Sequence, residues 1–279
     1  MTAFLDLLLD EARTRVAADR AREGTDALAA RISGPAPPSF ADALRAPGVA
    51  VIAEVKRASP SKGDLAPDLD AVAQGRAYRD AGVAAISVLT EPDRFKGSLD
   101  DLVAVSALGT PTLRKDFTVD RHQIVQARLA GASAVLLIVA ALDDDELATF
   151  ADAAAALDLS VLVEVHDEGE LARALAIEPA VVGVNARDLR TFEVDRDAFA
   201  RLRPAIPDDV VAVAESGVRG PADVGAAAAA GADAVLVGES LVVADDPEAA
   251  ARALVDAGRA TAGVGGESTG GPSRGLGRW

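Results

Sequence analysis

The sequence predicts an α/β protein, a single (β/α)8 TIM barrel with an additional N-terminal helical segment. Short β-type apolar runs alternate strictly with helical patterns along most of the chain, and eight such pairs can be counted. Each run is apolar throughout, as in parallel strands that are buried on both faces. An open doubly wound sheet is the alternative, but no Gly-x-Gly-x-x-Gly turn follows the first run. We therefore expect the sheet to close on itself.

Residues 1–46 are expected to form a helical extension that packs on the barrel. Apolar positions recur at helical spacing in residues 1–30, with arginine and aspartate on the other side, which predicts an amphipathic helix. This helix precedes the first strand, and we expect it to cover one end of the fold. The Pro- and Gly-rich residues 33–39 then break the chain, and residues 40–46 are predicted to form a short helical turn.

The barrel itself is predicted to span residues 47–261. Its strands are expected at 49–56, 84–90, 111–115, 134–139, 160–165, 181–185, 210–215 and 234–238. Its helices are expected near 70–81, 99–107, 120–130, 143–157, 168–176, 195–203, 221–230 and 247–258. Aspartates stand at the expected N-caps of three helices (Asp120, Asp143 and Asp195), and glycines end four of them: Gly82, Gly109, Gly131 and Gly231. Residues 262–279 are Gly- and Ser-rich and are predicted to form a disordered tail.

The composition excludes several classes of function. With 279 residues, half of them apolar, the chain can bury a sizeable core, although only 3% of its residues are aromatic. Its net charge of -16 argues against a nucleic-acid partner and against anionic membranes. It has no cysteine and two histidines, so neither a thiolate nor a His-rich metal site is expected. No signal-peptide or membrane-spanning pattern is found, which predicts a soluble, cytoplasmic protein.

Lysine is used sparingly and in particular places. It occurs only at positions 56, 62, 96 and 115, and the other 24 of the 28 basic residues are arginine. Lysine can lower its pKa and exchange a proton, whereas arginine cannot, so lysines at strand ends indicate ammonium chemistry. The many carboxylates suggest adaptation to high salt, because a Debye length of about 3 Å at 1 M screens their mutual repulsion.

Polar residues gather at the carboxyl ends of the predicted strands, where the active sites of such barrels lie. Side chains at i and i+2 of a strand share a face, so Glu54 and Lys56 should project together. Other strand ends contribute Lys115, Glu164, Asn185, Glu215, Ser216, Gly238, Glu239 and Ser240. Each group alone is more often a solvated strand end or part of a structural ion pair. Together they indicate a site, because several strands deliver ionisable or amide groups to one face.

Two parts of this set point to different tasks. The turns Glu-Ser-Gly-Val at 215–218 and Val-Gly-Glu-Ser at 237–240 follow strands seven and eight, where barrels of this class bind phosphate through backbone N–H groups. The lysines and carboxylates of strands one, three and five would face the other end of the substrate and exchange protons with it. The residues thus predict acid–base chemistry on a phosphorylated, carbonyl-bearing small molecule. His166 is a weaker candidate for a base, and His122 is expected to be a packing or surface residue.

Several stretches of the chain form a recognisable set of motifs. The first is Glu-Val-Lys-Arg-Ala-Ser-Pro-Ser-Lys-Gly at 54–63, and others lie at 86–92, 113–117, 162–167, 183–185, 187–189 and 214–217. Together they resemble the indole-3-glycerol phosphate synthase family of tryptophan biosynthesis. The resemblance covers roughly residues 40–245 and implies a (β/α)8 barrel with an extra N-terminal helical segment. It also implies a carboxy-lyase that converts 1-(2-carboxyphenylamino)-1-deoxyribulose 5-phosphate to indole-3-glycerol phosphate, carbon dioxide and water by lysine and glutamate acid–base catalysis.

The resemblance implies roles residue by residue. Lys115 would protonate the substrate carbonyl, and Glu164 would serve in the steps that complete dehydration. Lys56 would contact phosphate or carboxylate and could also donate a proton, so that the division of steps between the lysines stays open. Glu54 would orient and charge-balance the lysines.

The remaining implied residues bind the substrate or the intermediate, and three of them, Asn185, Glu215 and Ser216, are counted among the catalytic residues. The substrate's carboxylate, hydroxyls and intermediate would be bound by Asn185, Arg187, Glu215 and Ser216. Phosphate would be held by Ser59, Gly217, Gly238 and Glu239. The anthranilate ring would lie against Phe117, Leu136 and Leu189. Ala186 replaces an asparagine that is frequent in the family, which affects only a secondary contact.

Two other interpretations stay open on the sequence alone. One is another phosphate-binding barrel such as phosphoribosylanthranilate isomerase, although sugar isomerisation can work with one acid and one base. The other is a catalytically silent scaffold, but Lys115 and Glu164 are both present. Neither a metal nor an organic cofactor is expected. The predicted partners are the small-molecule phosphorylated substrate and, transiently, other tryptophan-pathway enzymes.

Overall fold

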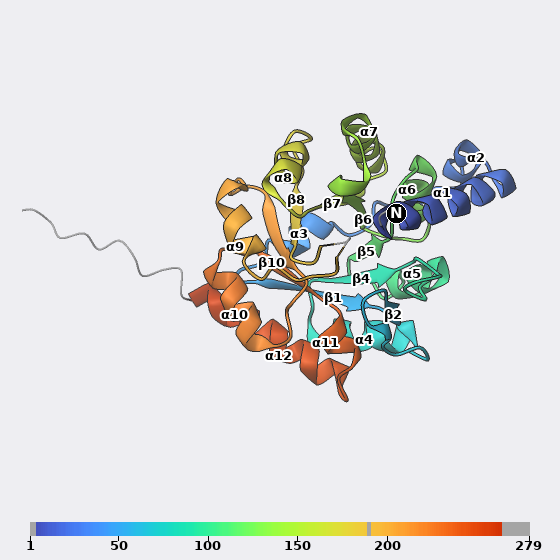
Figure 1. Cartoon of the computed structure of the whole chain (residues 1–279). Coiled ribbons are helices and arrows are strands. Elements are labelled where there is room, and N and C mark those ends of the chain that lie inside the picture. The colour runs from blue at the N-terminus through green and yellow to red at the C-terminus, as the bar shows by residue number, and fades with distance from the viewer. Residues whose placement is uncertain (1–3, 189–190, 264–279) are drawn as a thin grey trace, which may run out of the picture.

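Eight parallel strands close into a barrel in the computed structural model, which describes residues 4–188 and 191–263 (Figure 1). The strands are β1 (Ala50–Val55), β4 (Ala85–Leu89), β5 (Thr112–Lys115), β6 (Ala134–Ile138), β7 (Ser160–Val165), β8 (Val181–Asn185), β9 (Val211–Glu215) and β10 (Ala234–Val237). Strand β1 pairs with both β4 and β10, which closes the ring. The predicted closed barrel is therefore confirmed, and each predicted strand is found where the apolar run placed it.

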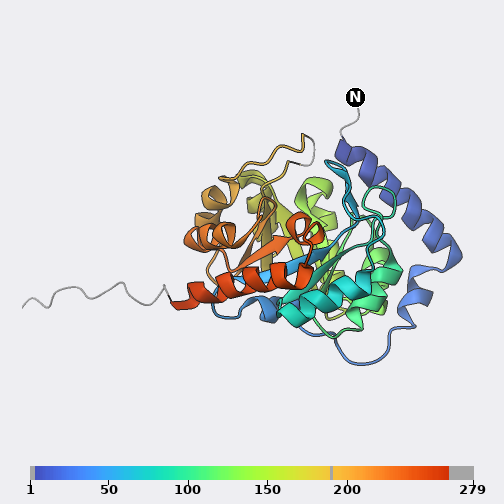
Figure 2. The same cartoon turned by 90° about the horizontal axis from the view of Figure 1, so that it is seen from below.

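Helices cover the outside of the barrel. They are α4 (Ala71–Ala81), α5 (Leu99–Ser106), α6 (Arg121–Leu129), α7 (Asp144–Ala155), α8 (Glu168–Leu175), α9 (Ala198–Leu202), α10 (Pro221–Ala229) and α12 (Pro247–Ala260). Figures 1 and 2 show α12 beside α4, so the last helix completes the ring next to the first. Among the described residues, none of the helices is long and apolar enough to cross a membrane.

Capping side chains and glycines fix the ends of several helices. Asp120 and Asp143 each accept a backbone N–H from the first turn of α6 and α7, as predicted. The prediction for Asp195 is wrong, because α9 begins only at Ala198 and Asp195 instead accepts the N–H of Asp197 within the preceding loop. Left-handed glycines with φ between 82° and 86° follow four helices, as predicted: Gly82, Gly109, Gly131 and Gly231.

Side chains alternate along each strand between the barrel interior and the surrounding helices. Ile52 and Leu162 belong to the inner cluster, whereas Val51 and Val163 pack on the outside against helices. Because inward positions recur every second residue, each strand has a last inward position near its carboxyl end. On four strands this position is ionisable: Glu54, Lys115, Glu164 and Glu215.

The N-terminal helix lies over the carboxyl ends of the strands. Helix α1 (Phe4–Arg22) places Arg15 Nη1 3.2 Å from Glu91 Oε1 and Arg15 Nη2 3.5 Å from Asp116 Oδ1. These two carboxylates follow β4 and β5 and are almost fully buried. Helix α2 (Thr25–Ala29) then packs on α6.

A second part of the N-terminal segment lies at the opposite end. Helix α3 (Phe40–Leu44) buries Phe40 and Leu44 in the same apolar cluster as the barrel interior. Arg45, just after α3, donates to the backbone oxygen of Asp209, ahead of β9. The segment therefore covers both ends of the barrel, where the sequence predicted only one.

Two small elements at the carboxyl ends of the strands were not predicted. After β1 the chain forms a hairpin of β2 (Ala58–Ser59) and β3 (Gly63–Asp64), and after β10 it forms the short helix α11 (Glu239–Val242). Short 3-10 turns complete the description at Val139–Ala141, Arg203–Ala205 and Thr261–Gly263. From residue 264 onward, the predicted tail lies outside the described residues.

Candidate active site

A pocket at the carboxyl ends of the strands brings most of the predicted site residues together. It is lined by Glu54, Lys56, Ser59, Lys115, Phe117, Leu136, Glu164, Asn185, Arg187, Glu215, Ser216 and Glu239. Gly217 and Gly238 are the chain neighbours of Ser216 and Glu239, and Leu189 lies outside the described residues. The side chains at the strand ends thus meet at one end of the barrel, as the sequence predicted.

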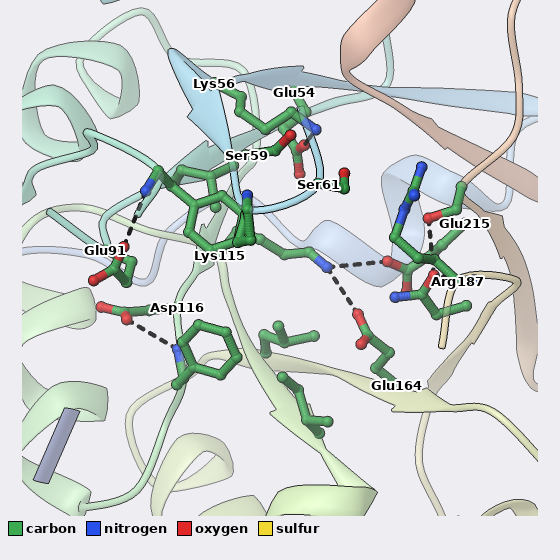
Figure 3. Close-up of a pocket in the computed structure, with 18 of the residues that line it drawn as sticks. Glu54, Lys56, Ser59, Ser61, Glu91, Lys115, Asp116, Glu164, Arg187 and Glu215 are labelled. Carbon is green, nitrogen blue, oxygen red and sulfur yellow. Dashed lines mark hydrogen bonds and ion pairs between the residues drawn. The ribbon is translucent and has the colours of Figure 1, made fainter. Parts of the chain in front are cut away.

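Lys115 lies between two glutamates at the centre of this pocket (Figure 3). Its Nζ is 2.8 Å from Glu164 Oε2 and 3.1 Å from Glu215 Oε2. The lysine side chain is 13% exposed, and each glutamate side chain is 2% exposed. One ammonium therefore faces two buried carboxylates, which is unfavourable for a purely structural interaction.

A second lysine–glutamate pair extends from β1. Lys56 Nζ is 2.9 Å from Glu54 Oε1, and Ser87 donates to Glu54 Oε2 at 3.2 Å. Gly238 leaves room for this pair, since a Cβ at that position would lie 2.6 Å from Glu54 Oε1. The two charges meet, as their spacing in the sequence predicts.

The buried ionisable groups differ in the direction of their pKa shifts. Burial by itself would lower the pKa of Lys115, but the charges of Glu164, Glu215 and Glu54 raise it above the ordinary value. Burial raises the pKa of Glu215. The charge of Lys115 lowers this pKa, but the charge of Glu164 offsets part of that effect, so that the pKa of Glu215 is about 7. For Glu164 burial is outweighed by Lys115 and His166, and its pKa falls to about 2. The two carboxylates titrate as a pair, in which Glu164 is ionised while Glu215 exchanges a proton near neutral pH.

The pKa of Lys115 differs from the interpretation of the sequence, which associated lysines at strand ends with a lowered pKa. The charges of three carboxylates, two in contact and that of Glu54 further away, act on this ammonium and outweigh the effect of its burial. Lys115 is therefore protonated in the free pocket, and its proton goes only to a strongly basic atom.

Asn185, Ser216 and Arg187 form a polar rim beside the two glutamates. Asn185 Oδ1 accepts from Ser216 Oγ at 2.8 Å and from the backbone N–H of Arg187 at 3.0 Å. Ser216 and Gly217 have φ values of 66° and 85°, so the chain turns sharply after β9 and brings the serine hydroxyl to Asn185. The Asn185 oxygen is thus occupied. Burial raises the pKa of Glu164, but the charges of Lys115 and His166 and the hydrogen bond from Lys115 lower it, and Asn185 adds a smaller lowering effect.

The hairpin after β1 lies next to the predicted phosphate end. Lys62 Nζ is 3.6 Å from Glu239 Oε1, and on the other side Lys96 Nζ is 2.6 Å from Asp64 Oδ1. The Glu239 carboxylate thus faces a lysine, while its backbone N–H lies in the first turn of α11, where an anion can be bound. Lys115 is the last residue of β5, and the other three lysines of the chain lie in the segments that follow β1 and β4.

Aromatic and apolar side chains form the other wall. Phe117 and Leu136 line it, and four further residues that were not predicted join them: Phe4 and Leu8 of α1, Phe95 and Phe192. Phe4 meets Phe192 edge to face with ring centroids 5.1 Å apart, and the rings of Phe95 and Phe117 are 6.3 Å apart. In the sequence Phe4 and Leu8 have the spacing of ordinary core residues of a helix, and no signal distinguishes them.

The two histidines lie in different surroundings. His166 Nδ1 is 2.9 Å from Glu170 Oε2, and its Nε2 is 3.7 Å from Glu164 Oε1, behind the pocket wall. His122 is buried in α6 and contacts Thr25 Oγ1 at 3.1 Å, so it is a packing residue as predicted.

Within residues 4–188 and 191–263, one group of carboxylates is close enough together to share a cation, namely Glu11, Glu91 and Asp93. Arginines already lie against it: Arg15 contacts Glu91, and Arg94 Nη2 is 2.8 Å from Glu11 Oε1. The backbone N–H groups of residues 93–95 also donate to Glu91. This cluster therefore anchors α1 over the pocket.

Comparison with known proteins gives one consistent family. A family model described as indole-3-glycerol phosphate synthase matches residues 5–254. Curated relatives with the same description align over 91% of this chain and 94% of their own length. The identity is 55% to the protein of Mycobacterium ulcerans (strain Agy99), 54% to that of Mycobacterium leprae (strain TN) and 52% to that of Mycobacteroides abscessus.

Solved structures share the fold at low sequence identity. The 3-hexulose-6-phosphate synthase from Salmonella typhimurium superposes with a TM-score of 0.62 at 16% identity, covering 75% of this chain and 98% of that chain. Thiamine phosphate pyrophosphorylase from Pyrococcus furiosus gives a TM-score of 0.60 at 14% identity, covering 78% of this chain and 98% of that chain. These likenesses support the barrel and nothing beyond the fold.

Proposed function

The chain belongs to the indole-3-glycerol phosphate synthase family, and from this premise we propose how its pocket divides the catalytic work. The protein is a carboxy-lyase that converts 1-(2-carboxyphenylamino)-1-deoxyribulose 5-phosphate to indole-3-glycerol phosphate, carbon dioxide and water. The observation that carries the proposed mechanism is the position of Lys115 between the buried carboxylates of Glu164 and Glu215.

The substrate lies with its phosphate toward the turns after β9 and β10 and its aromatic ring against the apolar wall. Backbone N–H groups of Gly217, Gly238 and Glu239 and the Ser59 hydroxyl bind the phosphate, with Lys56 beside them. Phe117 and Leu136 contact the anthranilate ring, and we extend this role to Phe95. The ketone carbon then lies near Lys115.

Lys115 acts in the ring closure. The aromatic carbon that bears the carboxylate attacks the ketone carbon, and the electron pair of the carbonyl moves to its oxygen, which takes a proton from Lys115. The developing alkoxide is the strongly basic acceptor that the raised pKa of Lys115 requires. The bond to the carboxylate then breaks, carbon dioxide leaves, and the released electron pair restores the aromatic ring.

The two glutamates act in the dehydration that follows. The new hydroxyl takes a second proton and leaves as water, and one proton is removed from the neighbouring methylene carbon. Glu164 is ionised and serves as the base, while Glu215 holds a proton near neutral pH and serves as an acid, with Lys56 as the other donor in reach. Asn185, Ser216 and Arg187 bind the intermediate. The reaction consumes one proton overall, because an anionic carboxylate leaves as a neutral molecule.

The purified protein should form a fluorescent indole product from this substrate, and Lys115→Ala should not. We expect a loss of about 10²–10⁴-fold in kcat, the range for removal of a general acid. Circular dichroism of the variant checks that it is folded. A folded Lys115→Ala protein with unchanged kcat would contradict the assignment.

We also propose the setting in which the protein works. A biosynthetic enzyme with a small phosphorylated substrate is expected in the cytoplasm, with only transient contacts to other tryptophan-pathway enzymes. The net charge of -16 disfavours a nucleic-acid partner. Co-elution of this protein with a neighbouring pathway enzyme in size-exclusion chromatography would contradict a transient contact.

A further inference from the structure

The mechanism needs Glu164 ionised and Glu215 protonated, yet the contacts of Lys115 with the two carboxylates are almost the same. Its Nζ is 2.8 Å from Glu164 and 3.1 Å from Glu215, and both glutamates are equally buried. The contact with Lys115 therefore does not decide which of the two holds the proton. A second interaction on one side is required.

His166 lies on the side of Glu164. Its Nε2 is 3.7 Å from Glu164 Oε1, the carboxylate oxygen that does not contact Lys115. Within the described part of the chain this Nε2 is buried without a hydrogen-bond partner. The corresponding oxygen of Glu215, Oε1, is also buried without a hydrogen-bond partner, and the ion pairs that His166 makes within 4.0 Å among the described residues are with Glu164 and Glu170. The two carboxylates thus differ in what lies behind them.

The contact on the other side of the imidazole fixes its protonation. Glu170 Oε2 lies 2.9 Å from His166 Nδ1 and also accepts the backbone N–H of His166 at 2.8 Å. An ionised carboxylate only accepts, so Nδ1 carries the hydrogen. A neutral imidazole would then direct a lone pair at the Glu164 carboxylate, whereas an imidazolium directs an N–H at it. The geometry favours the imidazolium.

We propose that His166 is a positioning residue whose imidazolium keeps Glu164 ionised and thereby leaves the proton of the pair on Glu215. The inference rests on the proposed function, because it assigns the acid and the base of that mechanism. The charged groups that face His166 are Glu164 of β7, Glu170 of α8 and Glu215 of β9, with Lys115 on the far side of Glu164. Burial lowers the pKa of His166, but Glu170, Glu164 and Glu215 raise it above the ordinary value, which agrees with the geometry.

An NMR titration tests the protonation without any catalytic turnover. The chain has two histidines, so protein labelled with 15N-histidine shows two imidazoles, and the variant His122→Asn assigns them. We expect His166 to stay protonated above the ordinary histidine pKa of about 6.5 and to titrate lower when Glu170 is replaced by glutamine. Burial lowers the pKa of His122, so the two signals should separate. A neutral His166 at pH values below about 6.5 would overturn the proposal.

Kinetics test the consequence for Glu164 and Glu215. In His166→Asn the shorter amide can still reach Glu170 but presents no group to Glu164, so kcat should fall about tenfold at neutral pH and KM should change little. His166→Gln directs an amide N–H toward Glu164 and should recover part of kcat, while the matched control His122→Asn should be unchanged.

The pH profile distinguishes this role from a structural one. Loss of the Glu215 proton near neutral pH lowers kcat in both proteins. The wild-type kcat should show an additional decline as pH rises through the titration of His166 measured by NMR, and His166→Asn should lack that additional step. Unchanged kcat and an unchanged profile in folded His166→Asn would overturn the proposal. An inactive wild-type protein would instead refute the proposed function, and the NMR titration would still decide the charge of His166.

Discussion

Replacing Gly183 with alanine tests how closely activity depends on the position of Glu215. Gly183 lies on β8 next to β9, and a Cβ there would be 2.0 Å from Glu215 Oε1 and 3.1 Å from Leu162 Cδ1. Non-bonded heavy atoms pack best at about 3.5–4.0 Å, so the Glu215 carboxylate has to move by more than about 1 Å.

That movement is large compared with the contact that holds Glu215 in place. Glu215 Oε2 lies 3.1 Å from Lys115 Nζ, and a hydrogen bond is essentially lost beyond about 3.6 Å. A misplacement of about 1 Å in a catalytic site can cost about 10²-fold in rate, so we expect kcat of Gly183→Ala to fall by about that factor. Overpacking should also lower the free energy of unfolding by about 1–3 kcal/mol.

A glycine elsewhere in the barrel provides the control. Gly225 lies in α10, and no atom lies within 4 Å of a Cβ placed there. Gly225→Ala should keep the wild-type kcat and gain about 0.5–1 kcal/mol of stability, as expected for alanine in a helix. Indole fluorescence measures turnover, and urea denaturation measures stability. Wild-type kcat in Gly183→Ala would contradict the role given to the Glu215 position.

Three further predictions concern charge. Because Glu215 has a folded-state pKa of about 7 against 4.5 for an ordinary glutamate, wild-type stability should fall as pH rises through that window. Glu215→Gln should remove this fall, which amounts to at most about 3 kcal/mol, and urea denaturation at about pH 5 and pH 8 measures it. Arg15→Met should leave the buried Glu91 and Asp116 without this cation, so the free energy of unfolding should fall by about 1–3 kcal/mol and KM should rise. The control is Arg13→Met at an exposed position, which should change stability by less than about 0.5 kcal/mol. Finally, the melting temperature should rise between dilute and molar KCl, since salt screens the repulsion within a chain of net charge -16, and a level curve would contradict adaptation to salt.

The barrel and its central charges could be predicted because they follow from short-range patterns. A strand can be recognised from about six consecutive residues, and its last inward-facing residue follows from the two-residue repeat of side-chain direction. Glu54 and Lys56 therefore could be placed on one face without knowledge of their neighbours. The closed ring then brings Lys115, Glu164 and Glu215 together, since each stands at an inward position near the end of its own strand.

The features that could not be predicted depend on contacts between distant parts of the chain. Phe4 and Leu8 line the pocket because α1 packs on the inner apolar cluster and its Arg15 contacts carboxylates that follow β4 and β5. The direction of the pKa shift of Lys115 depends on three glutamates from three other strands, and the sequence alone does not supply their distances. The N-cap assigned to Asp195 failed for a local reason, because an aspartate can bind a loop N–H as well as one in a helix.

The pairing of β1 with β10 has a consequence for how the chain is made. Ala50 pairs with Ala234, so the first strand of the barrel to leave the ribosome is completed by one of the last segments to be synthesised. Until then β1 presents an open edge to other nascent chains, and such edges promote aggregation. Helix α1, by contrast, finds its partners after β4 and β5 when less than half of the chain has been translated. The pocket wall therefore begins to assemble before the barrel can close, and a chain that stops short of β10 would retain a docked helix and an unclosed sheet.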